Sequence, residues 1–118
     1  MSRPDPSALL PLTEPVYYIL LALADADRHG YAILQEVEAR TGGSVRLRTG
    51  TLYTAIRRLL EQGLILETDE RPADDDERRR YYRLPDYGRK VARAEAERLE
   101  RLVGLAHDKA LLDANRSA

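Results

Sequence analysis

One segment of the sequence combines arginines with hydroxyl side chains and contains no carboxylate. From residue 44 to residue 60 the charged residues are Arg46, Arg48, Arg57 and Arg58. Their neighbours with hydroxyl groups include Thr49, Thr51, Tyr53 and Thr54. Guanidinium groups form paired hydrogen bonds with phosphate oxygens and with guanine, and hydroxyls reach either partner. The segment therefore favours contact with a polyanion, although exposed arginines can also be merely solvated and Tyr53 can serve packing alone.

A second arginine group follows an acidic run. Residues 74–77 are all acidic, and Arg78, Arg79, Arg80 and Arg83 come directly after them. Side chains alternate between faces in a strand, so at most two of the three consecutive arginines share one side. Carboxylates repel phosphate. We therefore expect the acidic run either to point away from a bound polyanion or to pair with the arginines until the polyanion displaces it.

The composition restricts the function classes. A chain of 118 residues with 43% hydrophobic and 33% charged residues is expected to form one globular domain. The net charge of −1 argues against a protein that simply coats nucleic acid. With no cysteine and two histidines far apart, we expect no metal site and no cofactor. No pattern for acid–base or nucleophilic catalysis is visible, so we expect no enzyme.

The sequence also indicates where the protein resides. The longest apolar stretch, from Val16 to Ala24, is far shorter than the roughly 18 residues of a membrane span. The first residues lack the pattern of a secretory signal. We expect a cytoplasmic protein without membrane contact.

Three helices are expected to position these side chains. Apolar residues at helical spacing predict helices over 14–24, 31–40 and 49–62. Thr13 is expected to cap the first helix, and Gly63 to end the third. A short strand is expected at 44–47, and two strands at 64–68 and 80–84 are expected to form a hairpin. On the third helix the threonines and arginines lie opposite the apolar stripe.

A long helix is expected at the C-terminal end. Its apolar residues are spaced four and three apart, as in a coiled-coil seam. They are Ala92, Ala96, Leu99, Val103, Ala106 and Ala110. Such a helix is about 39 Å long, more than a small head can cover. The pattern favours a homodimer; the alternative is a helix that folds back on the first helix of its own chain.

The order of these elements is that of a winged helix–turn–helix, a mainly α fold with a small β-hairpin. In this fold the third helix enters the major groove of DNA and the hairpin, or wing, lies over the adjacent backbone. We predict a flexible segment over 1–11, the winged helix–turn–helix over 12–84, a C-terminal dimerisation helix over 85–112 and a flexible tail over 113–118.

Four blocks resemble the PadR family of bacterial transcriptional regulators in order and spacing. They are HGYAIL at 29–34, GTLY at 50–53 followed by the Arg58–Leu59 pair, GLI at 63–65 and RRYYRL at 79–84. The resemblance covers roughly residues 12–112. It implies a dimeric DNA-binding repressor whose two heads each read half of an inverted repeat. It places the recognition helix on 49–62, with Tyr53 at the family's near-constant tyrosine, and the wing on 68–82.

The chain departs from the family pattern at three positions. Thr54 replaces a frequent proline, which adds a hydroxyl to the outer face. Leu60 replaces a frequent glutamate, which extends the apolar face. Pro85 replaces a common threonine, and we expect Asp86 to cap the last helix instead.

These observations predict a DNA-binding transcriptional regulator, with a protein–protein adaptor on the same fold as the alternative. The residues predicted to contact DNA are Arg48, Thr49, Thr51, Tyr53, Thr54, Arg57, Arg58, Arg79 and Arg80. The predicted partners are double-stranded DNA, a second copy of the chain and a small-molecule effector. Tyr17, Tyr18 and Tyr87, with Tyr31, are expected where the helices meet. They either line a pocket for an aromatic effector or fill the core.

Overall fold

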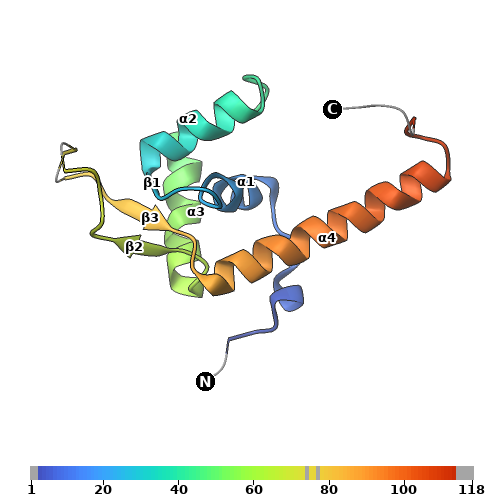
Figure 1. The fold of residues 1–118 in the computed structure, drawn as a ribbon, viewed down its shortest axis with the longest axis horizontal. Helices are drawn as coiled ribbons and strands as arrows, with labels where there is room; N and C mark the ends of the chain where they lie inside the picture. Colours follow the sequence, from blue (N-terminus) through green and yellow to red (C-terminus); the bar gives the residue numbers. More distant parts are fainter. Residues whose placement is uncertain (1–2, 74, 77, 114–118) are drawn as a thin grey trace.

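The computed structural model describes residues 3–73, 75–76 and 78–113. A 3-10 helix η1 (Pro6–Leu9) precedes α1 (Glu14–Ala22), β1 (Arg28–His29), α2 (Gly30–Arg40), α3 (Thr49–Gln62), β2 (Leu66–Thr68), β3 (Tyr81–Arg83) and α4 (Asp86–Asp108). The first three α-helices and the sheet form a head from which α4 extends (Figure 1). The architecture confirms the predicted mainly helical winged helix–turn–helix fold.

The helix ends follow from local side chains. The Thr13 hydroxyl accepts a hydrogen bond from the Val16 amide at 3.4 Å, which confirms the predicted cap of α1. His29 caps α2, because its Nδ1 accepts from the Ala32 amide at 3.1 Å. Gly63 ends α3 with a φ of 73°, a left-handed conformation that glycine adopts without strain.

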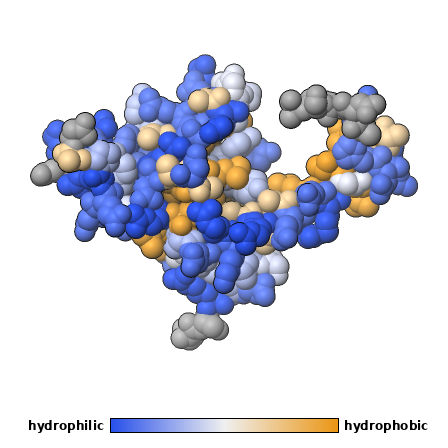
Figure 2. Space-filling view, viewed as in Figure 1, coloured by the Kyte–Doolittle hydropathy of each residue, from blue (hydrophilic) through white to orange (hydrophobic). Residues whose placement is uncertain are grey.

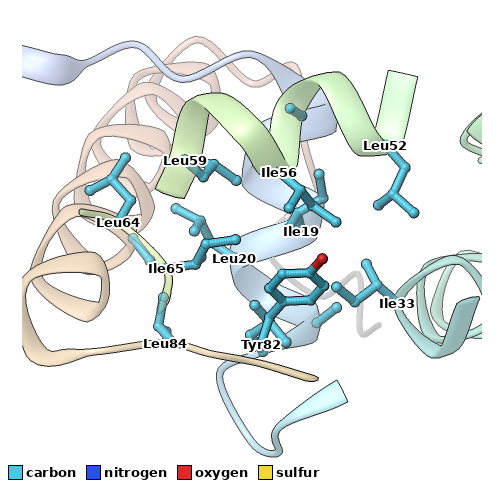
Figure 3. Close-up of a cluster of buried hydrophobic side chains, with 14 of the residues drawn as sticks. Ile19, Leu20, Ile33, Leu52, Ile56, Leu59, Leu64, Ile65, Tyr82 and Leu84 are labelled. Carbon is cyan, nitrogen blue, oxygen red and sulfur yellow. The ribbon is translucent and has the colours of Figure 1, made fainter. Parts of the chain in front are cut away.

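The core lies between the helices of the head and the sheet. Figure 3 shows side chains of α1, α2 and α3 meeting those of the segment after α3 and of β3. The largest fully buried apolar side chains are Ile19, Leu20, Ile33, Leu52, Leu59, Leu64, Ile65 and Val91. Burial of side chains of this size is the main force that holds the head together.

The sheet has three antiparallel strands in the order β1-β3-β2. Tyr81 of β3 pairs with His29 of β1 on one side and with Thr68 of β2 on the other. The predicted hairpin is therefore present as β2 and β3. The third strand of the sheet is formed by residues 28–29, which were not predicted to be a strand. The prediction of a short strand at 44–47 is wrong. This segment is a loop whose Val45 and Leu47 pack against the core.

The start of α4 is fixed by a close approach to the head. A methyl group on Gly88 would lie 2.0 Å from the Leu64 carbonyl oxygen, so only glycine fits there. Pro85, not Asp86, is the N-cap residue, and the described side chains provide no capping hydrogen bond. The prediction that Asp86 caps the helix is wrong, because Asp86 is already the first helical residue.

The far half of α4 extends beyond the head. The helix ends at Asp108 rather than near residue 112, and Ala110 follows with a left-handed φ of 59°. Ala110 therefore lies outside the helix that was predicted to carry it in the seam. Ala92 is 9% exposed and belongs to the core of its own head, so its side chain is not free for a partner either. Ala96, Leu99, Val103 and Ala106 remain on the extended part, and Figure 2 shows apolar side chains along it.

The N-terminal segment lies against α4. The segment predicted to be flexible over 1–11 contains η1, and its Leu9 and Leu10 pack on the core. The Leu12 amide donates to Glu95 of α4 at 2.8 Å. Glu95 is only 2% exposed, and the hydrogen bond from Arg98 holds its pKa below the usual range against the opposing effect of burial. Of the predicted flexible tail, only Asp113 belongs to the described residues.

None of the helices in the described part of the chain is long and apolar enough to cross a membrane. Within the same residues, no group of histidine and carboxylate side chains is arranged to hold a metal ion.

Candidate nucleic-acid interface

The outer face of α3 is exposed because the opposite face is buried. Leu52, Ala55, Ile56 and Leu59 pack into the core and fix the rotation of the helix about its axis. All nine residues predicted to contact DNA are exposed. Arg48 lies at the N-cap of α3, six others lie on the helix, and Arg79 and Arg80 lie just before β3.

The arginines of α3 have no acidic partner. Arg48, Arg57 and Arg58 form no ion pair with any residue that the structure describes. Thr51, Thr54 and Arg58 line a hollow of about 500 Å³ between α3 and the start of α1. The surface thus offers hydroxyl donors and full positive charge to an approaching anion.

The arginines of the wing, by contrast, are paired. Arg78 lies 3.1 Å from Asp76, Arg79 2.9 Å from Asp75, and Arg80 3.3 Å from Glu67. The expected pairing of the acidic run with these arginines is confirmed for Asp75 and Asp76. Asp74 and Glu77 lie outside the described residues.

Tyr53 combines packing with exposure. A methyl group on Gly30 would lie 2.5 Å from the Tyr53 hydroxyl oxygen, so the phenol rests on the first turn of α2. The side chain is nevertheless 46% exposed. Tyr53 therefore packs α3 against α2 and still leaves part of its side chain on the surface.

Beside Tyr53 lies a second hollow, of about 290 Å³, where the start of α2, α3 and the wing meet. His29, Tyr82 and Arg79 also line it. Burial and the nearby Arg79 guanidinium lower the pKa of His29, and Asp75 opposes them. His29 and Tyr82 were not among the predicted site residues, although they belong to the HGYAIL and RRYYRL blocks and line this hollow.

The tyrosines of the predicted effector pocket do not form one cluster. Tyr17 and Tyr18 line a groove of about 430 Å³ between α1 and α4. Tyr87 is instead covered by the N-terminal segment, because its hydroxyl donates to the Pro4 carbonyl at 2.7 Å. Tyr31 lies 61% exposed at the start of α2. The prediction that Tyr87 lines the same pocket is therefore wrong. Tyr17 and Tyr18 do share one groove.

Comparison with known proteins identifies the family that shares this arrangement of helices and wing. The sequence model of the transcriptional regulator PadR-like family matches residues 19–94, more than half of the chain. The chain belongs to this family. The match covers the recognition helix, the wing and the start of α4, and it confirms the resemblance carried by the four sequence blocks.

Relatives of known sequence are less informative about function. An uncharacterized protein X of Lysinibacillus sphaericus is 35% identical over 71 residues, which are 60% of this chain and 64% of the relative. An uncharacterized transposon protein of Streptomyces fradiae is 37% identical over 95 residues, which are 80% of this chain and 26% of the relative. The PadR-like chain thus spans less than two thirds of the length of either relative.

Solved structures share the fold of this PadR-like protein. A transcriptional regulator from Clostridium thermocellum is 26% identical with a TM-score of 0.68, covering 80% of this chain and 87% of its own. A PadR family regulator from Eggerthella lenta is 30% identical with a TM-score of 0.59, covering 85% and 82%. Bacillus subtilis PadR in complex with operator DNA is 20% identical with a TM-score of 0.56, covering 66% and 44%, and shows likeness of fold alone.

Proposed function

We propose that this PadR-like regulator binds double-stranded DNA as a homodimeric repressor, with α3 of each copy in the major groove of one half of an inverted repeat. The observation that carries the proposal is the exposed surface of residues 48–60, which has no carboxylate and whose Arg48, Arg57 and Arg58 form no ion pair with a described residue. The complex of Bacillus subtilis PadR with operator DNA supports it, since that protein has the same fold.

The two ends of the α3 surface have different tasks in this proposal. Thr51, Thr54, Arg57 and Arg58 lie along the helix and read base edges or adjacent phosphates. Arg48 and Thr49 at its start bind the backbone, where the helix dipole also favours a phosphate. The wing with Arg79 and Arg80 follows the neighbouring backbone. Charge neutralisation of several phosphates supplies most of the affinity and makes it depend on salt.

The dimer in this proposal uses the part of α4 that extends beyond the head. Leu102 is 50% exposed, Val103 46% and Leu105 61%. Exposed apolar side chains in such number on one helix end favour burial against another chain. A second copy that covers them would set two α3 helices at a fixed spacing, as two half-sites of an operator require.

We further propose that an aromatic effector binds the groove between α1 and α4 and releases the DNA. Tyr17 and Tyr18 supply its aromatic wall, and Leu12, Leu21 and Leu99 its apolar lining. Because α4 forms one wall and carries the proposed dimer contact, an occupant of this groove would change the spacing of the two heads.

Selection of bound sequences from a random duplex library tests the DNA-binding step. The expected result is an enriched inverted repeat whose affinity falls steeply between about 50 and 200 mM salt.

Light scattering tests the dimer. It should give twice the chain mass, and Val103→Asp should give the monomer and lose cooperative binding to the repeat. A matched change on the same helix, Arg93→Asp, should keep the dimer. A dimer that enriches no sequence and binds no duplex would instead support the adaptor function.

A further inference from the structure

The hollow between the start of α2, α3 and the wing is lined mainly by hydrogen-bond donors, of which the three arginines are paired with carboxylates at its rim. Its polar side chains are those of His29, Tyr31, Tyr53, Tyr82 and the three arginines that precede β3, and none of the described residues that line it carries a carboxylate. Donors from three separate elements that converge on one space favour an oxyanion as the occupant.

His29 must present an N–H to the hollow. Its Nδ1 accepts a hydrogen bond from the Ala32 amide at 3.1 Å, so Nδ1 carries no proton. A neutral imidazole then carries its proton on Nε2. The Arg79 guanidinium lies 3.3 Å from Nε2, and a guanidinium can only donate. The contact is therefore donor against donor, and the Nε2–H has no acceptor among the described residues.

Tyr82 presents a second donor in the same situation. Its side chain is only 4% exposed, and no described residue hydrogen-bonds its hydroxyl. Figure 3 shows this hydroxyl pointing toward α3 and Ile33 rather than back along β3. None of the buried side-chain oxygens of the described residues lacks a partner, so this hydroxyl, which makes no hydrogen bond, is open to solvent and can donate to an acceptor that enters the hollow.

Asp75 is a carboxylate that acts on His29, and its oxygens already accept hydrogen bonds. Its Oδ1 accepts from Arg79 at 2.9 Å and from the Asp76 amide at 2.8 Å, and its Oδ2 accepts from the Tyr81 hydroxyl. Asp75 therefore holds Arg79 at the rim of the hollow. It does not satisfy His29 or Tyr82.

We propose that this hollow binds one phosphate group of the DNA backbone, with the His29 Nε2–H and the Tyr82 hydroxyl as neutral donors and Arg79 as the cation. The proposal rests on the proposed DNA-binding function. It adds two positioning groups that lie outside α3 and fixes the register of the wing on the duplex. Inorganic phosphate offers the same chemistry and is the second source to be tested.

Conservative variants test the DNA source. Tyr82→Phe removes only the hydroxyl, and His29→Asn keeps a capping acceptor for α2 while it removes the Nε2–H. Each should weaken binding of the selected duplex about tenfold and leave the salt dependence of the affinity unchanged, because neither donor is charged. Arg79→Ala should instead reduce the salt slope by about one. Tyr87→Phe and His107→Asn, outside the hollow, should bind as the parent does.

Nitrogen-15 NMR of the imidazoles gives a readout that folding defects do not mimic. The chain has two histidines, so His107 serves as the internal control. At neutral pH the His29 spectrum should show the Nε2–H form, and Nε2 should shift when duplex DNA or inorganic phosphate is added at constant ionic strength. An Nδ1–H form, or no shift with either ligand, would overturn the proposal.

The outcomes separate this proposal from the function on which it rests. If the parent binds DNA, Arg57→Ala weakens it, and both hollow variants bind as the parent does, the phosphate site is wrong and the regulator function stands. If the parent binds no duplex but phosphate shifts His29, the DNA source is wrong and the anion site stands. If Tyr82→Phe fails to fold, His29→Asn and the NMR titration still decide the question.

Discussion

The outer face of α3 and the wing both present arginines, but the arginines differ in what they contact. Arg57 and Arg58 on α3 form no ion pair with a described residue, whereas Arg79 and Arg80 of the wing each lie within 3.3 Å of a carboxylate. An unpaired guanidinium gives its full charge to an incoming phosphate. A paired guanidinium must first exchange its carboxylate for the phosphate, so it adds less to the free energy of binding.

The two regions also differ in how firmly they are held. Four side chains of α3 are buried, which fixes which face of the helix is turned outward. In the wing, β2 and β3 have three residues each, and only β3 is buried. A surface that reads bases needs the fixed geometry of α3, while contacts to a regular backbone tolerate the weaker support of the wing.

The difference in anchoring predicts the largest effect. Ile56→Ala removes a side chain that is 2% exposed beneath the arginines of α3, and it should lower the free energy of unfolding by about 2–5 kcal/mol. Leu66→Ala in β2, where the side chain is 39% exposed, should cost less than about 1 kcal/mol. Urea unfolding followed by circular dichroism measures both. Equal losses would show that the wing is anchored as firmly as α3.

The difference in pairing predicts the next effect. Arg57→Ala or Arg58→Ala should weaken binding of the selected duplex by about 1–3 kcal/mol, or about 5- to 150-fold, if the arginine contacts a base. Arg80→Ala, which also removes the Glu67 pair, should cost less than about 1 kcal/mol. Fluorescence anisotropy at fixed salt provides the measurement. The distinction between α3 and the wing fails if Arg80→Ala weakens binding as much as Arg57→Ala does.

The four α-helices could be predicted from the sequence because each is a local pattern. The apolar stripe of α3, for example, requires only the spacing of residues within 14 positions. The end of α4 was predicted too late, since the heptad spacing continues past Asp108 into residues that leave the helix. Pattern alone does not reveal where the backbone turns.

What the sequence did not reveal depends on contacts between distant segments. β1 has only two residues, and it becomes a strand because β3 pairs with it more than 50 positions later. The exposure of the nine DNA-contact candidates agrees with the sequence analysis, but their contact with DNA stays a prediction. That His29 and Tyr82 line one hollow was not visible either, because this hollow forms where α2, α3 and the wing meet.

His29, which caps α2 and lies beside Arg79 of the wing, should make the stability of the fold depend moderately on pH. Burial, followed by Arg79, lowers the pKa of His29 below its unfolded value of about 6.5. The group therefore stabilises the fold fully above that pH, and the contribution is lost as the pH falls through the lowered folded pKa. Protonation of Nδ1 would also remove the cap of α2, which is worth about 1 kcal/mol.

Urea unfolding at pH values from about 7.5 down to 5.5 measures this contribution. The parent should lose stability over this range, and His29→Asn should lose less, because an asparagine cap does not titrate there. A slope that His29→Asn leaves unaltered would assign the pH dependence to another group.

The smallest expected effect on duplex binding is an increase in affinity, whereas the arginine variants should lower it. Asp75→Asn keeps an oxygen that accepts from Tyr81 but removes the charge that competes with phosphate for Arg79. Duplex binding should tighten by up to about fivefold, the range of an exposed ion pair, and the salt slope should rise because one more full charge meets the backbone. Asp86→Asn, an exposed acid at the start of α4, should change neither quantity. Weaker binding by Asp75→Asn would mean that the carboxylate positions Arg79 for DNA rather than withholding it, and the wing would then be as preorganised as α3.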